Sequence, residues 1–359
     1  MIDEALLKTE ERAVFALRQL YRSYGYLPYK MSKFEEFEYY IRNKDFLISD
    51  RFITFTDMGG KLLALKPDVT LSIVKRPADA PGCKQKVCYN ENIYRVSGST
   101  KRFTEMMQAG LECVGDIDLY DIYEAVSLAA QSLGLIADDF LLQVSHLGIL
   151  SEALDRIGAD SDFRQTAIGY IAEKNAHDLT RLCQDNGVEP ELLTIFVSAY
   201  GPRSEVINLL EKRIPGPAVE ELKALSSLLE GCPWSERIIF DFSVVGNMNY
   251  YNGIVFNGFI NGVDQRLLSG GQYDKLMEKL GRSGGAIGFA LYLDLLEQLP
   301  GLNRGWDVDV LLLYDDPVRV PGAVEKLVAA GKTVSAQKNL PERLRYREVL
   351  DLRKGALGC

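Results

Sequence analysis

Residues 93–115 place the strongest constraint on what this chain can fold into, because they read as two strands joined by a flexible loop at 97–100. In the returning strand, Gln108, Gly110 and Glu112 are spaced by two, so they share one face of the sheet. Buried polar side chains need partners. This face therefore either lines a polar pocket or, as these residues alone favour, lies in solvent.

Length and charge limit the classes of function that fit the chain. With 359 residues it can bury a large core and form two or three domains. A net charge of −9 argues against nucleic-acid binding, which needs a basic patch or stripe. No apolar run is long enough to cross a membrane, and the acidic N-terminal segment differs from a secretory signal.

Cysteine and histidine usage points to a site without metal. The six cysteines are scattered with no CxxC pair, and there are only two histidines. This pattern argues against a structural zinc site and against a disulfide framework. We therefore expect no metal and no cofactor, and a location in the reducing cytoplasm.

The pattern of residues predicts an α+β chain with a helical insertion. Strand-like segments flank the central stretch on both sides, whereas residues 151–231 are helix-rich and broken by glycine and proline. Residues 270–274 are expected to open a helix. The pattern favours one domain over 1–300, with the insertion at about 151–231, and a short C-terminal α/β unit over 305–359, in which the basic run 343–347 reads as a solvated helix face.

Five stretches, in the same order along the chain, resemble motifs of the histidyl-tRNA synthetases, which are class II aminoacyl-tRNA synthetases. They are residues 65–70 (LKPDVT), 93–115 (motif 2, with Gln-x-Gly-x-Glu), 250–256 (YYNGIVF), 270–274 (GGQYD) and 287–291 (IGFAL). Several ordered motifs are less expected by chance than one. The resemblance implies a class II synthetase-like antiparallel sheet flanked by helices.

Four positions depart from that family's pattern. By the resemblance, Gly246 and Leu295 stand where the synthetases carry catalytic arginines, Asn249 stands for an aspartate, and Ser97 for the glutamate of motif 2. Fixed cations are needed to neutralise phosphate charge as it develops, and leucine cannot replace arginine there. We therefore expect no catalytic residues and no aminoacylation.

The resemblance also implies that the amino-acid pocket is kept. It assigns histidine binding to Asp68, Thr70, Arg95, Gln108, Glu112, Tyr250, Tyr251 and Tyr273. Carboxylates suit an ammonium group and an imidazole N–H, and tyrosines supply an aromatic wall with a polar tip. A kept ligand pocket without ATP chemistry is typical of a sensor.

This combination resembles the ATP phosphoribosyltransferase regulatory subunits, through Pro67-Asp68-x-Thr70 and through residues 146–149 (HLGI). The resemblance implies a non-catalytic subunit that activates the short catalytic phosphoribosyltransferase and lets histidine inhibit it. It further implies a homodimer within a hetero-oligomer, in the cytoplasm, with no nucleic acid or membrane partner.

Three alternatives stay open at this point. Arg95, Arg102 and the Gly-Gly-x-Tyr-Asp stretch would suit a working histidyl-tRNA synthetase. A synthetase-like paralogue could instead serve another partner or bind another small ligand. The polar residues could also only satisfy one another, since buried polar networks are often structural.

Overall fold

The computed structural model describes residues 7–44, 47, 52–75, 82–96, 101–246, 248, 250–299 and 306–353. The chain divides into two compact units, Met1–Gln298 and Leu299–Cys359. The predicted loop at 97–100, with Ser97, and position Asn249 lie outside the described residues. Within the described part, no helix is both long and apolar enough to cross a membrane.

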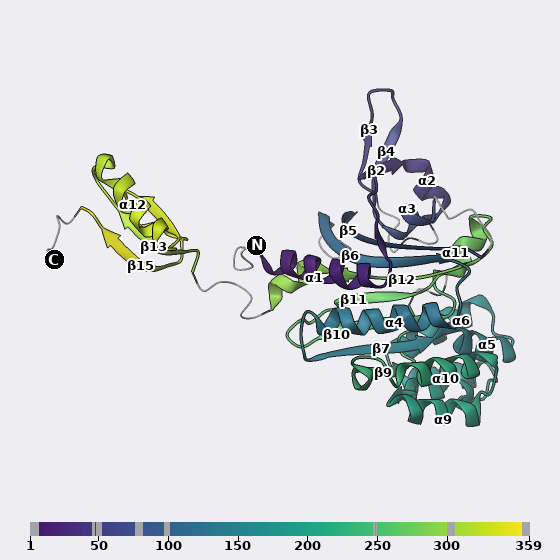
Figure 1. Cartoon of the computed structure of the whole chain (residues 1–359). Helices are drawn as coiled ribbons and strands as arrows, with labels where there is room; N and C mark the ends of the chain where they lie inside the picture. Colours follow the sequence, from purple (N-terminus) through teal and green to yellow (C-terminus); the bar gives the residue numbers. More distant parts are fainter. Residues whose placement is uncertain are drawn as a thin grey trace. The chain divides into compact units, whose positions relative to one another are not determined.

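A nine-stranded sheet forms the centre of the first unit, in the order β1-β5-β6-β12-β11-β10-β7-β9-β8 among the described residues (Figure 1). Its strands are β1 (Leu27–Pro28), β5 (Lys84–Val96), β6 (Phe103–Gly115), β7 (Phe140–His146), β8 (Tyr200–Gly201), β9 (Ile238–Asp241), β10 (Ile254–Ile260), β11 (Leu268–Gln272) and β12 (Gly285–Tyr292). The expected antiparallel pairing holds through the middle of the sheet. The pairs β1–β5 and β7–β9 are parallel, so the sheet is mixed.

Helices α4 (Leu119–Gly134) and α1 (Thr9–Ser23) are among the helices that pack on this sheet. Helix α4 contacts β7, β10 and β12, and helix α1 contacts β5 and β6. Helix α4 begins at a capping box, in which the Asp118 side chain accepts hydrogen bonds from the backbone N–H groups of Tyr120 and Asp121. Its apolar face is buried along its length, which fixes it against the sheet.

A small antiparallel sheet with the strand order β2-β4-β3 is formed by residues between strands β1 and β5 of the large sheet. It consists of β2 (Phe34–Glu36), β3 (Thr54–Thr56) and β4 (Leu62–Leu65), with helices α2 (Phe37–Arg42) and α3 (Thr70–Val74). Asp68 and Thr70 follow strand β4 in the sequence. The turn between β3 and β4 is closed by Asp57 Oδ1, which accepts from Gly59 N and Lys61 N at 2.8 Å each.

The segment expected as a helical insertion contains β8 as its only strand, and every residue from 151 to 231 is described. The helices are α5 (Leu147–Arg156), α6 (Ser161–Ala172), α7 (Ala176–Asp185), α8 (Glu191–Ser198), α9 (Arg203–Arg213) and α10 (Pro217–Leu229). His146 begins α5 as its cap, because its Nδ1 accepts from Gly148 N at 3.1 Å. His146 therefore acts as a helix cap, and among the described residues no group of three or more side chains could hold a metal ion.

The expectation that residues 270–274 open a helix is wrong for the glycines. Gly270 lies in strand β11 opposite Phe289, and helix α11 (Asp274–Lys279) begins only after Tyr273. A Cβ on Gly270 would lie 2.5 Å from the carbonyl oxygen of Gly288. The glycine is therefore needed for close strand packing, not for a turn. The chain then leaves β12 through the 3₁₀ helix η4 (Leu293–Gln298).

The second unit is a three-stranded parallel sheet in the order β14-β13-β15, with β13 (Val308–Leu313), β14 (Val334–Gln337) and β15 (Tyr346–Asp351). The short helix η5 (Pro317–Arg319) and helix α12 (Val320–Ala329) connect β13 to β14. The basic run 343–347 does not form a helix face. Arg345 forms a salt bridge with Asp307 at 2.8 Å, and Tyr346 begins β15, because pairing with β13 outweighs local preference.

Candidate functional site

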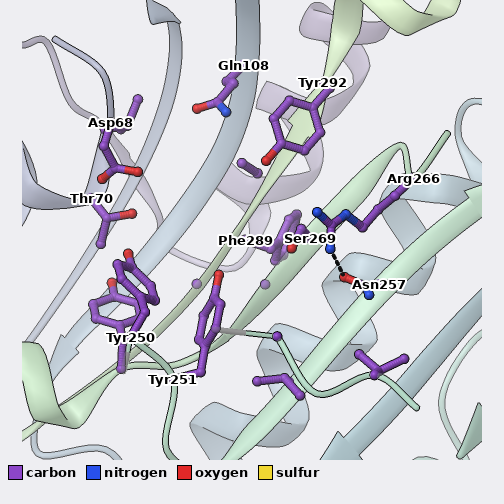
Figure 2. Close-up of a pocket in the computed structure, with 18 of the residues that line it drawn as sticks. Asp68, Thr70, Gln108, Tyr250, Tyr251, Asn257, Arg266, Ser269, Phe289 and Tyr292 are labelled. Carbon is purple, nitrogen blue, oxygen red and sulfur yellow. Dashed lines mark hydrogen bonds between the residues drawn. The ribbon is translucent and has the colours of Figure 1, made fainter. Parts of the chain in front are cut away.

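A pocket of about 410 Å³ lies over the central strands of the large sheet (Figure 2). Strands β5, β6, β10, β11 and β12 each contribute to its lining. All eight residues that the sequence assigned to ligand binding line this one pocket: Asp68, Thr70, Arg95, Gln108, Glu112, Tyr250, Tyr251 and Tyr273. The pocket's volume falls in the range of small-molecule sites, roughly 300–1,000 Å³.

Glu112 is the buried acid of the pocket, with 2 % of its surface exposed. Its Oε1 accepts a hydrogen bond from Thr70 Oγ1 at 2.8 Å, and its Oε2 accepts one from the Tyr273 hydroxyl. No ion pair joins it to a cationic side chain of the described residues. Burial raises the pKa of Glu112 to about 8, although the two hydrogen bonds oppose this shift. Because no cation balances its charge, Glu112 is mostly protonated near pH 7 in the ligand-free chain, and a bound cation would favour its ionised form.

The register of the sheet places Glu112 there. Strand β6 carries it opposite Gly288 of β12 on one side and Val87 of β5 on the other. Gln108, four residues earlier on the same face, is 4 % exposed and also reaches the pocket. The solvated-face interpretation of this strand is therefore wrong, because the face is covered by the aromatic residues and by the segment before α3.

Asp68 has two roles. Its Oδ1 accepts from Leu71 N at 3.1 Å, in the first turn of helix α3, and so satisfies a free backbone N–H group there. Its Oδ2 lies 3.8 Å from an Nη2 of Arg95, which also donates through Nε to the carbonyl of Pro67 at 2.8 Å. Burial raises the pKa of Asp68, and the Arg95 charge opposes that shift.

Three tyrosines form one wall of the pocket. The rings of Tyr250 and Tyr251 meet edge to face with centroids 4.6 Å apart, and Tyr250 lies 5.6 Å from Tyr273. Burial raises the pKa of all three hydroxyls, so they remain neutral near pH 7. A neutral phenol can donate a hydrogen bond while its ring contacts an apolar or aromatic part of a ligand.

The far side of the pocket holds residues that the sequence did not indicate. They are Asn257, Arg266, Ser269 and Tyr292. Arg266 Nη1 donates to Asn257 Oδ1 at 3.3 Å, and Figure 2 shows this pair across the pocket from Asp68 and Thr70. Arg266 lies two residues before β11 in a segment with no motif, and the pairing of β10 with β11 brings it to the pocket.

The two positions where catalytic arginines were expected to be missing differ in location. Gly246 lines the pocket with φ +52°, and a Cβ there would approach Tyr251 Cδ2 to 3.3 Å. Any other residue would adopt this left-handed conformation only with strain. Leu295 lies in η4 and is not among the lining residues. Neither position supplies a positive charge.

The model of the family described as "Histidyl-tRNA synthetase" matches residues 2–296. The chain belongs to this family. A protein from Oceanobacillus iheyensis named "ATP phosphoribosyltransferase regulatory subunit" is 27 % identical over 290 residues, which cover 78 % of this chain and 71 % of that protein.

Two solved structures share the fold. One is that of "an ATP phosphoribosyltransferase regulatory subunit/histidyl-tRNA synthetase" from Bacillus halodurans, with TM-score 0.74 and 23 % identity, covering 96 % of this chain and 93 % of the other. The other is a chain of the "ATP phosphoribosyl transferase (HisG:HisZ) complex" from Thermotoga maritima, with TM-score 0.63 and 19 % identity, covering 79 % and 97 %. They confirm the class II synthetase-like fold predicted from the motifs.

Proposed function

We propose that this chain is a regulatory subunit of ATP phosphoribosyltransferase in histidine biosynthesis, and that histidine binds in the pocket. The relative from Oceanobacillus iheyensis bears the name of that subunit. The surroundings of the Glu112 side chain support a ligand that carries a cationic group, such as an amino acid. This carboxylate is buried, accepts two hydrogen bonds and has no cation beside it among the described residues. An ammonium or imidazole N–H would supply the missing partner.

The aromatic wall fits the rest of such a ligand. The rings of Tyr250 and Tyr251 offer faces and edges to an imidazole, and Gln108 offers both a donor and an acceptor. The Asp68–Arg95 pair is already balanced within the protein. Glu112 is therefore the acid that gains most from a bound cation, because the cation compensates the desolvation of its ionised form without breaking an existing ion pair.

The proposal includes a partner and a direction of control. By this reading the chain forms a homodimer within a hetero-oligomer with the short catalytic phosphoribosyltransferase, which needs it for activity. Histidine inhibits because it binds the two states of the assembly with different affinity, which is the requirement for any ligand that shifts an equilibrium. ATP and the phosphoribosyl donor react in the partner, outside this chain.

A working synthetase is the less favoured function. Activation of histidine needs cations on the phosphates of ATP, and the motif resemblance places Gly246 and Leu295 where the synthetases have arginines. Arg95 does line the pocket, but it is engaged by Asp68 and by the carbonyl of Pro67. By this proposal the chain binds histidine but does not activate it with ATP.

The deciding experiment is an ATP phosphoribosyltransferase assay on the short catalytic subunit, with and without this chain, while histidine is titrated. We expect activity only with the chain and inhibition by histidine. Glu112→Gln should keep activation and lose inhibition, whereas the matched variant Glu189→Gln, at an exposed glutamate outside the pocket, should keep both. If the chain neither associates with the catalytic subunit nor activates it, the assignment is wrong. ATP- and histidine-dependent pyrophosphate exchange would then test the synthetase.

A further inference from the structure

Two arginines line the pocket, and they differ in what they are bound to. Arg95 is largely buried, pairs with Asp68 and donates to a backbone carbonyl. Arg266 is exposed, and no carboxylate of the described residues forms an ion pair with it. Its hydrogen-bond acceptor is the neutral amide of Asn257, at 3.3 Å. Arg266 is thus a cation that faces the pocket with most of its donors unused.

Arg266 gives the pocket a positively charged side opposite its acidic side. Figure 2 shows its guanidinium on the side opposite Asp68 and Thr70, with the hydroxyl of Tyr251 between the two sides. The electrostatics of Tyr251 agree with this arrangement. Burial raises the pKa of its hydroxyl most, Tyr292, Glu112 and Asp68 raise it further, and the positive charge of Arg266 lowers it. Tyr251 therefore lies within reach of both sides.

An α-amino acid carries the complementary pair of charges, with an ammonium at one point and a carboxylate close by. The acidic side of the pocket can hold the cationic groups of such a ligand, but carboxylates repel its carboxylate. Gly246 offers no charge, and Arg95 is occupied. Among the described lining residues, this leaves Arg266 to meet the carboxylate, and a guanidinium fork matches a carboxylate in two hydrogen bonds.

We propose that Arg266 binds the α-carboxylate of the amino-acid ligand and so makes the pocket selective for the free amino acid over analogues that lack a carboxylate. The proposal rests on the proposed function, in which histidine is the ligand. Asn257 acts as a positioning residue, because its amide oxygen holds the guanidinium toward the pocket. Selectivity of this kind would let the site report the amino acid itself and ignore the corresponding amino alcohol.

Calorimetric titration of the full-length chain with L-histidine and with L-histidinol tests this assignment. Histidinol keeps the ammonium and imidazole groups and replaces the carboxylate by a hydroxymethyl group. We expect the wild-type chain to bind histidine about tenfold or more tightly than histidinol, since a hydrogen-bonded charge pair of this kind is worth at least that factor. Arg266→Gln should weaken histidine binding by a similar factor and leave histidinol binding unchanged, which removes the preference.

The control is Arg181→Gln, at an exposed arginine of helix α7, which should keep the wild-type preference. Because Arg266 is exposed, its variant is expected to fold, and thermal unfolding checks this. An unchanged preference in Arg266→Gln, or equal losses for both ligands, would overturn the role of Arg266 while the histidine site stands. Failure of the wild-type chain to bind histidine would overturn the site itself and this proposal with it.

Discussion

Gly288 lies directly opposite Glu112 in the pairing of β12 with β6, and a Cβ at position 288 would come within 1.8 Å of Glu112 Oε2. The buried carboxylate therefore occupies the space that a side chain on β12 would take. The same Cβ would also lie 2.4 Å from the carbonyl oxygen of Leu111. Since backbone cannot move aside cheaply, the glycine is a structural condition for the acid of the pocket.

The first prediction concerns this glycine. Gly288→Ala should destabilise the chain by about 1–3 kcal/mol through overpacking and should abolish histidine binding, because Glu112 must leave its position. Thermal unfolding and calorimetric titration measure the two effects. Gly169→Ala is the matched control, since a Cβ at this position in helix α6 meets nothing within 4 Å. Normal histidine affinity in Gly288→Ala would contradict the proposed place of Glu112 in the site.

The second prediction follows from the pKa of Glu112, which burial raises to about 8. The unfolded chain releases this proton at the ordinary glutamate pKa, whereas the folded chain keeps it until about pH 8. The contribution of Glu112 to stability is thus complete below the ordinary pKa and falls as pH rises to about 8, by at most about 1.4 kcal/mol per pH unit.

Urea unfolding of the ligand-free chain at several pH values checks this. The stability of Glu112→Gln relative to the wild-type chain should increase between pH 5 and about 8 and stay constant above it. A difference that is independent of pH would show that Glu112 titrates normally in the folded chain.

Tyr273→Phe is expected to weaken histidine binding at neutral pH. The variant removes a hydrogen bond that stabilises the ionised form of Glu112, so the pKa of that carboxyl rises further and less of it is available to a cation. Titration of histidine at pH 7 measures the loss. Tyr120→Phe removes a comparable hydrogen bond to Glu124 outside the pocket and should leave binding intact. Equal affinity in both variants would rule out this role for Tyr273.

The two roles of Asp68 can be separated by substitution. Asp68→Asn can still accept from Leu71 N and should keep stability, but it removes the charge beside Arg95 and should alter histidine affinity. Asp68→Ala removes both and should cost a further 0.5–2 kcal/mol, roughly, as capping residues do. Unfolding and binding are measured on both variants. If asparagine and alanine destabilise equally, the cap contributes nothing.

Much of the pocket could be predicted from the sequence because its residues occur in motifs. Gln108 and Glu112 share a face by simple alternation, and Tyr250, Tyr251 and Tyr273 belong to two recognisable stretches. Alternation along a strand fixes which residues share a face, and a motif fixes which residues lie close together. Only the contacts between the stretches depend on the rest of the fold.

The parts that could not be predicted depend on which strands pair and not on the pattern of the segment itself. Arg266 follows no periodic pattern and reaches the pocket only because β10 pairs with β11. The basic run around Arg345 reads as a helix face by itself, yet the chain after it joins β13 as a parallel strand. In both cases the pairing of strands decides the outcome, over 10–16 residues for β10 with β11 and over 38 residues for β13 with β15, and the pattern of the segment itself does not show it.

The order of strands in the large sheet determines the stage of folding at which the pocket forms. Strand β6 of the β5–β6 hairpin pairs with β12, whose residues lie 170 to 184 positions after their partners, with the helices α5–α10 between them. Contacts of such long range form slowly, because the loop must close before the pairing compensates for it. We therefore expect the helices to fold early and the site to be completed only when β12 pairs with β6. A ligand that binds only the folded chain stabilises it against global unfolding. Histidine would therefore also raise the free energy of unfolding of the subunit that binds it.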